Sequence, residues 1–219
     1  MRTLYRAAVA VILVLHAMSA AAQGSALRAG RWEFTLQPQY VDSMSVSGGN
    51  GSRANIDSDW GFGFGLTYNF DNHFALGGEL TWNDAGYRAR IVPGPGNAGS
   101  SFDLVGTMET STLRMNATWN FLAAAFTPFV TGGIGATWVD TNIPNGPTSC
   151  WVDPWWGTYC DTPTRSNTYF SYNAGAGLRW DVNRSFFMSA TYIRQFINVG
   201  GATGTPAADQ FRLAFGFKY

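Results

Sequence analysis

The sequence predicts an all-β fold, an eight-stranded antiparallel up-and-down barrel, and three observations support this prediction. Large apolar side chains alternate with small or polar ones in eight separate runs, and alternation with a period of two is typical of a β-strand with one apolar face. Short and long connections follow one another in turn between the runs. Only 13% of the residues are charged whereas 16% are aromatic, and a β-protein whose outer surface faces water normally carries more charge.

The first 22 residues have the layout of a secretory signal peptide. Arg2 and Arg6 precede an apolar stretch over residues 7–15, and small residues follow up to the predicted cleavage point after residue 22. The apolar stretch is far shorter than the roughly 20 residues that a membrane-spanning helix needs, so a helical anchor is the less favoured alternative. We therefore expect one barrel domain over residues 23–219, with a net charge near zero or slightly negative that gives no indication of nucleic-acid binding.

The first predicted strand covers residues 32–40 and the second covers residues 60–70. In the first, Trp32 and Phe34 alternate with charged and polar residues. Pro38 lies within it and has no backbone N–H to donate, so we expect a bulge or an early strand end near this position. In the second strand, large apolar residues alternate with glycine, threonine and asparagine, which gives the strand one large face and one small face.

The remaining strands repeat this pattern. They cover residues 74–83, 112–121, 126–138, 170–180, 186–192 and 211–219. The seventh strand can be read in two registers, and we favour the one that turns Phe186, Met188 and Tyr192 outward because its outward set is the more apolar. The eighth strand alternates without interruption. Its large face consists of Phe211, Leu213, Phe215, Phe217 and Tyr219.

Three features predict that a lipid bilayer covers the large faces. Most predicted strands have about 9 to 11 residues, the length that a tilted strand needs to cross the hydrocarbon layer. Aromatic residues gather at both strand ends, where the lipid headgroups would lie. An even strand number with short turns at one end and long loops at the other is the outer-membrane barrel arrangement. The turns are residues 71–72, 122–125 and 181–184, and the loops lie around residues 41–59, 84–110, 140–168 and 195–209.

The alternative is a soluble eight-stranded ligand-binding barrel or sandwich with the aromatic face turned inward. Its water-facing surface would then consist of glycine, serine, threonine and asparagine, and Lys218 is the only lysine of the chain. Because such a surface is poorly suited to water, we favour the membrane barrel.

The signal layout, the alternating strands, the long outer loops and the aromatic last strand together resemble the small outer-membrane barrels of Gram-negative bacteria, the group of the OmpA transmembrane domain, OmpX, OmpW and the opacity proteins. The resemblance implies a place in the outer membrane, in contact with lipid and lipopolysaccharide. It also implies that residues 211–219 form the signal for the barrel-assembly machinery, with Tyr219 in place of the commoner phenylalanine. That family hosts adhesins, structural tethers, enzymes and channels, so the resemblance leaves the function open.

The inward faces predict how the interior is filled. An eight-stranded barrel is just wide enough for side chains to fill, and unpaired buried charges are costly. We therefore expect the inward charges to pair into an ion network that plugs the lumen, with a structural and surface-interaction role for the barrel. The network consists of Glu33, Glu79, Arg114, Arg179 and Arg212. Many other inward residues are glycine, which leaves a narrow porin-like channel for small or hydrophobic solutes as the alternative.

Cys150 and Cys160 are the only cysteines and lie in the third long loop. Because this loop should face the outside of the cell, where oxidising conditions favour disulfides, we predict a bridge between them. The bridged segment contains Trp151, Trp155, Trp156 and Tyr159. We expect these aromatic residues to form a contact surface for a host molecule, a glycan or another envelope component. The alternative is that they pack on the other loops or enter the outer leaflet.

No motif predicts catalysis, a metal site or a bound cofactor. Enzymes of this architecture need a histidine at the outer rim as a general base, but His16 belongs to the predicted signal peptide and His73 lies beside the first short turn. The sequence has no zinc-binding motif and no glycine loop suited to phosphate. We therefore expect no enzyme activity, with a barrel-rim acyltransferase as the less favoured alternative.

Overall fold

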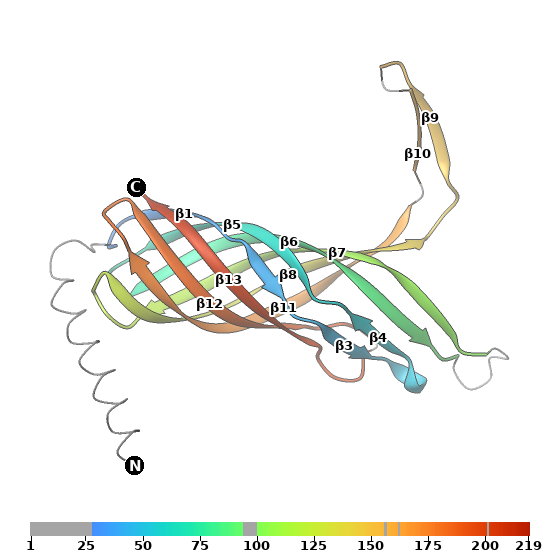
Figure 1. The fold of residues 1–219 in the computed structure, drawn as a ribbon, viewed down its shortest axis with the longest axis horizontal. Coiled ribbons are helices and arrows are strands. Elements are labelled where there is room, and N and C mark those ends of the chain that lie inside the picture. Colours follow the sequence, from blue (N-terminus) through green and yellow to red (C-terminus); the bar gives the residue numbers. More distant parts are fainter. Residues whose placement is uncertain (1–27, 94–99, 156, 162, 201) are drawn as a thin grey trace, which may run out of the picture.

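The computed structural model describes residues 28–219, apart from residues 94–99, 156, 162 and 201. The predicted signal peptide, residues 1–22, and Trp156 lie outside the described residues. Long antiparallel strands form one elongated barrel (Figure 1). Within the described part of the chain, no helix is long and apolar enough to cross a membrane.

The described residues form, in chain order, thirteen strands and one short 3-10 helix. They are β1 (Trp32–Leu36), β2 (Gln39–Val41), β3 (Met44–Ser47), η1 (Gly49–Gly51), β4 (Arg53–Ile56), β5 (Asp59–Asn69), β6 (Phe74–Ile91), β7 (Phe102–Asn120), β8 (Phe126–Pro144), β9 (Ser149–Asp153), β10 (Gly157–Asp161), β11 (Thr164–Asp181), β12 (Phe186–Ile197) and β13 (Ala207–Lys218).

Eight strands close the wall of the barrel when β1 and β2 are counted as one interrupted strand. β5, β6, β7, β8, β11, β12 and β13 follow around the wall, each antiparallel to its neighbours. The last strand returns to the first, with Phe217 opposite Phe34 and Phe211 opposite Tyr40. This closure confirms the predicted eight-stranded up-and-down barrel.

The interruption between β1 and β2 falls at Pro38, where the sequence predicts it. Gln37 and Gly63 exchange two backbone hydrogen bonds of 2.8 and 2.9 Å just before this residue. The carbonyl of Pro38 accepts a 3.0 Å bond from the N–H of Leu213 on the opposite neighbour. The wall therefore stays hydrogen-bonded on both sides of the proline, although the ladder loses one donor.

Six strands are longer than predicted, and two of them, β12 and β13, have 12 residues each. β6 and β11 have 18 residues and β7 and β8 have 19, so much of the expected loops at 84–110 and 140–168 continues the barrel wall (Figure 1). The first expected loop contains the β3–β4 hairpin, which extends the wall by pairing β4 with β6. The predicted strand ends were wrong because bilayer thickness sets only the minimum length of a strand. Neighbouring antiparallel strands continue to pair beyond the lipid as long as their backbones stay within hydrogen-bonding distance.

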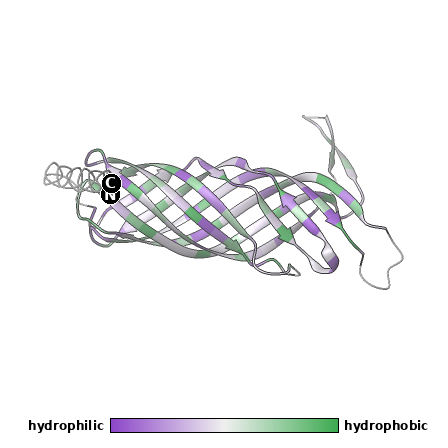
Figure 2. Ribbon diagram, turned by 60° about the horizontal axis from the view of Figure 1, so that its bottom comes forward, coloured by the Kyte–Doolittle hydropathy of each residue, from purple (hydrophilic) through white to green (hydrophobic). Residues whose placement is uncertain are grey.

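The two faces of the wall differ in burial as predicted. Outward Trp60 and Ile134 are 69% and 60% exposed, whereas inward Arg114 is fully buried, and apolar and polar residues alternate along the strands in Figure 2. In β12, Ile193 is 1% exposed and Tyr192 is 41% exposed. The seventh wall strand therefore has the favoured register, with the even-numbered residues outward.

Aromatic residues form two rings on the outside of the barrel. The ring at the short-turn end, called the inner girdle, consists of Phe70, Phe74, Phe121, Phe126, Trp180 and Tyr219. The ring at the loop end, called the outer girdle, consists of Trp60, Trp82, Trp138, Phe170 and Tyr192. Most of these side chains are exposed, and Trp60 also packs on Tyr40 with ring centroids 5.5 Å apart. Such girdles mark the two lipid–water boundaries of a membrane barrel.

Candidate functional site

The barrel interior contains an ion cluster at the short-turn end, called the inner cluster. The guanidinium of Arg179 donates two hydrogen bonds to Glu33, of 2.6 and 2.9 Å, and also contacts Asp181 at 2.9 Å. Asp181 in turn accepts from Lys218 at 2.7 Å and from Arg28 at 2.8 Å. All five side chains are at most 8% exposed. Charges taken out of water are tolerated when they are paired in this way.

Arg28 also ties the inner cluster to the short turns. Its Nη2 donates to the carbonyl of Leu122 at 2.6 Å, and its Nε donates to the carbonyl of Asn72 at 3.1 Å. The side chain of Asn72 accepts from the backbone N–H of Arg28 at 3.0 Å. The segment before β1 is thereby fixed against the turns that precede β6 and β8.

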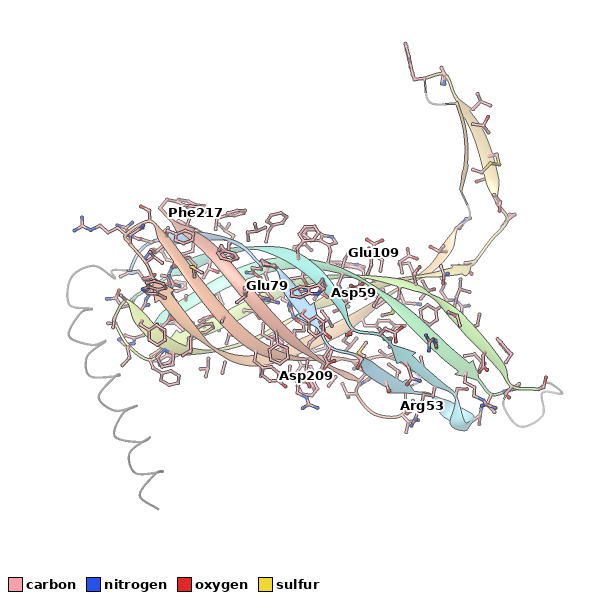
Figure 3. All side chains as sticks on the ribbon, in the orientation of Figure 1. Arg53, Asp59, Glu79, Glu109, Asp209 and Phe217 are labelled. Carbon is pink, nitrogen blue, oxygen red and sulfur yellow. A yellow bond between two sulfur atoms is a disulfide. The ribbon has the colours of Figure 1, made fainter. Side chains whose placement is uncertain are left out.

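A second ion cluster, called the outer cluster, lies further along the interior. Glu79 on β6 contacts Nε of Arg114 at 2.7 Å and Nη1 of Arg212 at 2.7 Å. Arg114 is directly opposite Glu79 on β7, whereas Arg212 reaches it from β13 and also donates to Gln39 at 3.1 Å. Figure 3 labels Glu79 within the barrel. One carboxylate thus links strands from different sides of the wall.

The outer cluster continues into a group of neutral polar side chains. Nη1 of Arg114 donates to Gln195 at 3.2 Å, and Gln210 donates to the same oxygen of Gln195 at 2.6 Å. Gln195 donates to the hydroxyl of Thr137 at 3.1 Å, and Thr137 to Ser171 at 3.0 Å. This chain of contacts joins β7, β8, β11, β12 and β13 across one level of the interior.

Two phenylalanine rings occupy space that inward glycines provide. A Cβ atom added to Gly216 would collide with the ring of Phe187, and one added to Gly177 would lie 2.7 Å from the ring of Phe129. Phe187 also lies under the guanidinium of Arg179, 3.8 Å from its ring centroid. These glycines therefore admit aromatic rings to the interior, and the room they offered for a channel is partly filled.

A small cavity remains between the two ion clusters. It has a volume of about 100 Å³, and its lining includes Glu33 and Arg179 at one end and Glu79 and Arg212 at the other. The two clusters contain five cationic and three anionic side chains. This part of the interior consequently carries an excess of positive charge.

The structure brings the predicted network residues together in two groups rather than one. Glu79, Arg114 and Arg212 belong to the outer cluster, and Glu33 and Arg179 belong to the inner cluster. The sequence reasoning missed Arg28 and Asp181. Arg28 precedes the first strand, and Asp181 was assigned to the third short turn although it is the last residue of β11. Asp181 lies two positions after the inward Arg179, and this spacing was the signal that could have identified it as an inward residue.

The third loop contains a separate hairpin of β9 and β10, which projects from the barrel in Figure 1. Cys150 and Cys160 are opposite each other in it and form the predicted disulfide. Gly157 begins the returning strand with a positive φ of 90°, which glycine adopts without strain. Of the four predicted contact residues, Trp155 is 86% exposed. Trp156 lies outside the described residues, and only the backbone of Trp151 and Tyr159 is described.

The C-terminal strand presents its large residues outward. Phe217 and Tyr219 are 56% and 66% exposed, and Phe217 is labelled on the outer surface near the chain end in Figure 3. The inward neighbours Arg212 and Lys218 belong to the ion clusters. The predicted assembly signal and the interior network therefore occupy opposite faces of the same strand.

His73 lies at the short-turn end of the barrel. Its Nδ1 is 2.8 Å from the carbonyl of Asn120, and its ring stacks on Trp119. Across the described residues, no three His, Cys, Asp or Glu side chains are grouped so as to hold a metal ion. The contacts of His73 assign it to the packing of the turn.

The family model described as outer membrane protein beta-barrel domain matches residues 7–219. Similar solved structures include Neisserial surface protein A, with 11% identity, a TM-score of 0.49 and coverage of 84% of this chain and 95% of that one. The attachment invasion locus protein Ail of Yersinia pestis has 13% identity and a TM-score of 0.46, with coverage of 87% of this chain and 99% of that one. OprG from Pseudomonas aeruginosa has 16% identity and a TM-score of 0.46, with coverage of 87% of this chain and 96% of that one.

None of the curated proteins matches the chain in sequence. The family match nevertheless covers nearly the whole length, including every wall strand of the barrel. The closed eight-stranded wall, the lipid-facing aromatic girdles and this match agree with one another. The protein belongs to the outer-membrane β-barrel family of Gram-negative bacteria and resides in the cell outer membrane.

Proposed function

We propose that this protein is a structural and surface-display barrel, whose interior is occupied by side chains and whose outer hairpins contact molecules outside the cell. The observation that carries the first part is the pair of ion clusters. Each cluster joins strands from different sides of the wall, and the charged side chains in them are buried. Eight strands enclose little more than the volume of such side chains, so continuous water through the barrel would require several ion pairs to separate.

A flux measurement tests the closed interior. Liposomes that contain the purified barrel and entrapped chloride should release chloride no faster than liposomes without protein. A matched preparation with Glu79→Gln shows whether the outer cluster controls any release. Rapid chloride release by the unchanged protein would exclude a closed interior.

The display role rests on the β9–β10 hairpin. It forms its own two-stranded sheet apart from the wall, is closed by the Cys150–Cys160 disulfide and exposes Trp155. A constrained loop with large aromatic residues loses little conformational entropy when it binds a partner. This combination supports contact with a host molecule, a glycan or another envelope component.

Replacing residues 151–159 by a glycine and serine linker of equal length, with both cysteines retained, tests this role. We expect cells that display the altered barrel to lose adhesion to host cells or capture of the partner, while the barrel still assembles. The single change Trp155→Ser should weaken binding in the same direction. Unchanged adhesion in the linker variant, with equal amounts of barrel at the surface, would rule out the hairpin as the contact site.

A narrow channel is the second candidate function. It is favoured by the cavity between the clusters and by the excess of positive charge around it. Such a channel would pass small anions more readily than cations. Under a KCl gradient, its reversal potential should indicate anion selectivity, and Arg212→Gln should reduce this selectivity.

A further inference from the structure

The outer end of the barrel contains a second and larger cavity, called the outer chamber. Its volume is about 210 Å³, and residues from β2, β3, β4, β6, β7, β8, β11, β12 and β13 line it. Its lower part is level with the outer girdle, because Asn83 follows Trp82 on β6 and is opposite Thr110, which is opposite Val139. The chamber therefore extends outward from the lipid boundary, in the part of the wall that the long strands add.

The lining of the outer chamber is unusually apolar for a barrel interior. Ile56, Ala85 and Tyr87 are buried there, and Met44 and Met108 pack against them. The interior between the girdles contains the ion clusters and small polar residues, together with the rings of Phe129 and Phe187. Above the membrane these inward positions are not obliged to be apolar, since polar side chains would be compatible with water. A concave apolar surface of this kind suits an apolar occupant.

The floor of the chamber is polar and neutral. Gln195 and Gln210 both line it, and each is less than 5% exposed. In the described contacts, the side-chain nitrogen of Gln195 donates to Thr137 and that of Gln210 donates to Gln195. A carboxamide nitrogen carries two N–H groups, so each glutamine has one N–H beyond these two bonds. The floor also rests on the outer cluster through Arg114, which closes the chamber toward the membrane.

The charged residues that line the chamber are acidic, and the cationic Arg114 lies beneath its floor. Asp42 and Asp57 are among its lining residues, and no Lys or Arg is among them. Both carboxylates are exposed to solvent and would repel a negatively charged ligand that approaches the chamber. A neutral ligand meets no such repulsion.

We propose that the outer chamber is a binding site for a small neutral molecule, with an apolar body against Ile56, Tyr87 and Met108 and one hydroxyl or carbonyl oxygen toward Gln195 and Gln210. The volume limits its size, because an apolar cavity of about 150 Å³ holds one benzene molecule. A substituted single aromatic ring or a short alkyl chain with one polar group fits this description. The site goes beyond the proposed structural and display role and does not require a conducting lumen.

Equilibrium dialysis of the purified barrel in lipid nanodiscs tests the proposal, with empty nanodiscs as the reference for partition into lipid. The probes are 2-phenylethanol, its apolar analogue ethylbenzene and its anionic analogue phenylacetate. We expect saturable binding of 2-phenylethanol at about one molecule per barrel, and binding of phenylacetate weaker by about tenfold or more, the factor that corresponds to 1.4 kcal/mol. No saturable binding of 2-phenylethanol above empty nanodiscs would overturn the proposal, and equal binding of phenylacetate would overturn the neutral class.

Two substitutions on β7 locate the binding. Thr110→Phe fills the chamber from an inward, lining position and should abolish binding of 2-phenylethanol. Thr107→Phe places the same side chain on the exposed outer face of the same strand and should leave binding unchanged. Folding of each variant is checked by its heat-dependent migration in SDS gels, and Val139→Phe serves as a second way to fill the chamber. Equal binding by a folded, chamber-filling variant would place the ligand elsewhere.

A third substitution tests the floor. Gln210→Leu removes one ligand-facing amide while keeping a similar volume. It should weaken binding of 2-phenylethanol several-fold and leave ethylbenzene nearly unaffected, because only the alcohol has an oxygen to accept from the amide. If both compounds lost affinity equally, the polar floor would have no part in recognition. Chloride flux is measured on the same variants, so that failure of the binding proposal can be told apart from failure of the closed-interior proposal.

Discussion

Arg28 and Asp181 form an ion pair across the short-turn end of the barrel, with Nη1 2.8 Å from Oδ2, although 153 positions separate them in the chain. The same carboxylate contacts Arg179 and Lys218. Three cations, from the segment before β1, from β11 and from β13, therefore contact one acidic residue. This makes Asp181 the centre of the inner cluster.

Asp181→Asn should destabilise the barrel strongly. The substitution leaves buried cations without their partner, and breaking a buried ion pair from one side typically costs about 3 to 5 kcal/mol. Urea unfolding in lipid vesicles, followed by tryptophan fluorescence, measures the change. The matched control is Asp209→Asn, because Asp209 pairs with Arg194 at 3.8 Å on the exposed surface. That change should cost about 1 kcal/mol or less, and equal losses for the two variants would contradict the role of the inner cluster.

Gly216→Ala should also destabilise the barrel, because its Cβ would collide with Phe187. Overpacking of this kind costs about 1 to 3 kcal/mol. When Phe187→Ala is already present, the added methyl group should be tolerated or even favourable, so the two substitutions should not be additive in a double-mutant cycle. Gly78→Ala is the control, since its Cβ would meet no atom closer than 3.9 Å. Additive effects of the first two substitutions would show that the ring and the glycine do not share this space.

Reduction of the Cys150–Cys160 bridge should loosen only the third loop. The β9–β10 hairpin forms its own sheet, and in the chain-entropy model a bridge over so short a segment contributes roughly 2 to 3 kcal/mol to local order. We expect Cys150→Ser with Cys160→Ser to increase protease cleavage within residues 145–163, while the barrel keeps its heat-dependent migration in SDS gels. Loss of the folded barrel would instead mean that the hairpin supports the wall.

The first short turn should respond to acid. Asp71 accepts hydrogen bonds from the backbone N–H groups of Phe74 and His73, at 2.7 and 2.6 Å, and these bonds lower the pKa of Asp71 below its ordinary value of 3.8. Because the pKa of Asp71 is lowered in the folded state, the stabilisation that its carboxylate gives the turn is complete above pH 3.8. This stabilisation is lost as the pH falls through the lower, folded-state pKa. NMR titration of the Asp71 carboxyl measures this directly.

The third short turn serves as a control for this titration, because a neutral asparagine accepts the corresponding bonds there. Asn183 accepts the equivalent bonds from Ser185 and Phe186, both at 2.8 Å. Amide exchange at the first turn should therefore accelerate in acid while exchange at the third turn shows no such step. An Asp71 pKa at or above 3.8 would show that the turn does not favour the charged carboxylate.

The wall of the barrel within the membrane could be predicted from sequence because lipid imposes a strict period on it. Every outward position between the girdles must be apolar, and this indicated the register of β12. A closed wall also needs a backbone N–H from each residue, and this indicated the interruption at Pro38. Outside the lipid this constraint ends. The continuation of β6 to Ile91 and of β7 from Phe102 therefore had no comparable signal, and neither had the outer chamber that these extensions enclose.

The interior was predictable in part for the same reason. Strand periodicity identified Glu79 and Arg114 as inward residues, but it does not say which charges lie at the same level across the barrel. That depends on the stagger between strands, which joins Glu33 to Arg179 and Glu79 to Arg212. Arg28 lies before the first strand, where no period applies, and only the folded chain brings it to Asp181.

Single-channel recording in planar lipid bilayers tests the closed interior most directly. If the ion clusters and the aromatic rings fill the lumen, the purified protein should insert without producing stable conductance steps, in high salt as well as in low salt. Glu79→Gln and Arg114→Gln, recorded in parallel, show whether any steps depend on the outer cluster. Stable steps from the unchanged protein, with a conductance that shifts in either variant, would contradict the closed barrel and establish a channel through the outer cluster.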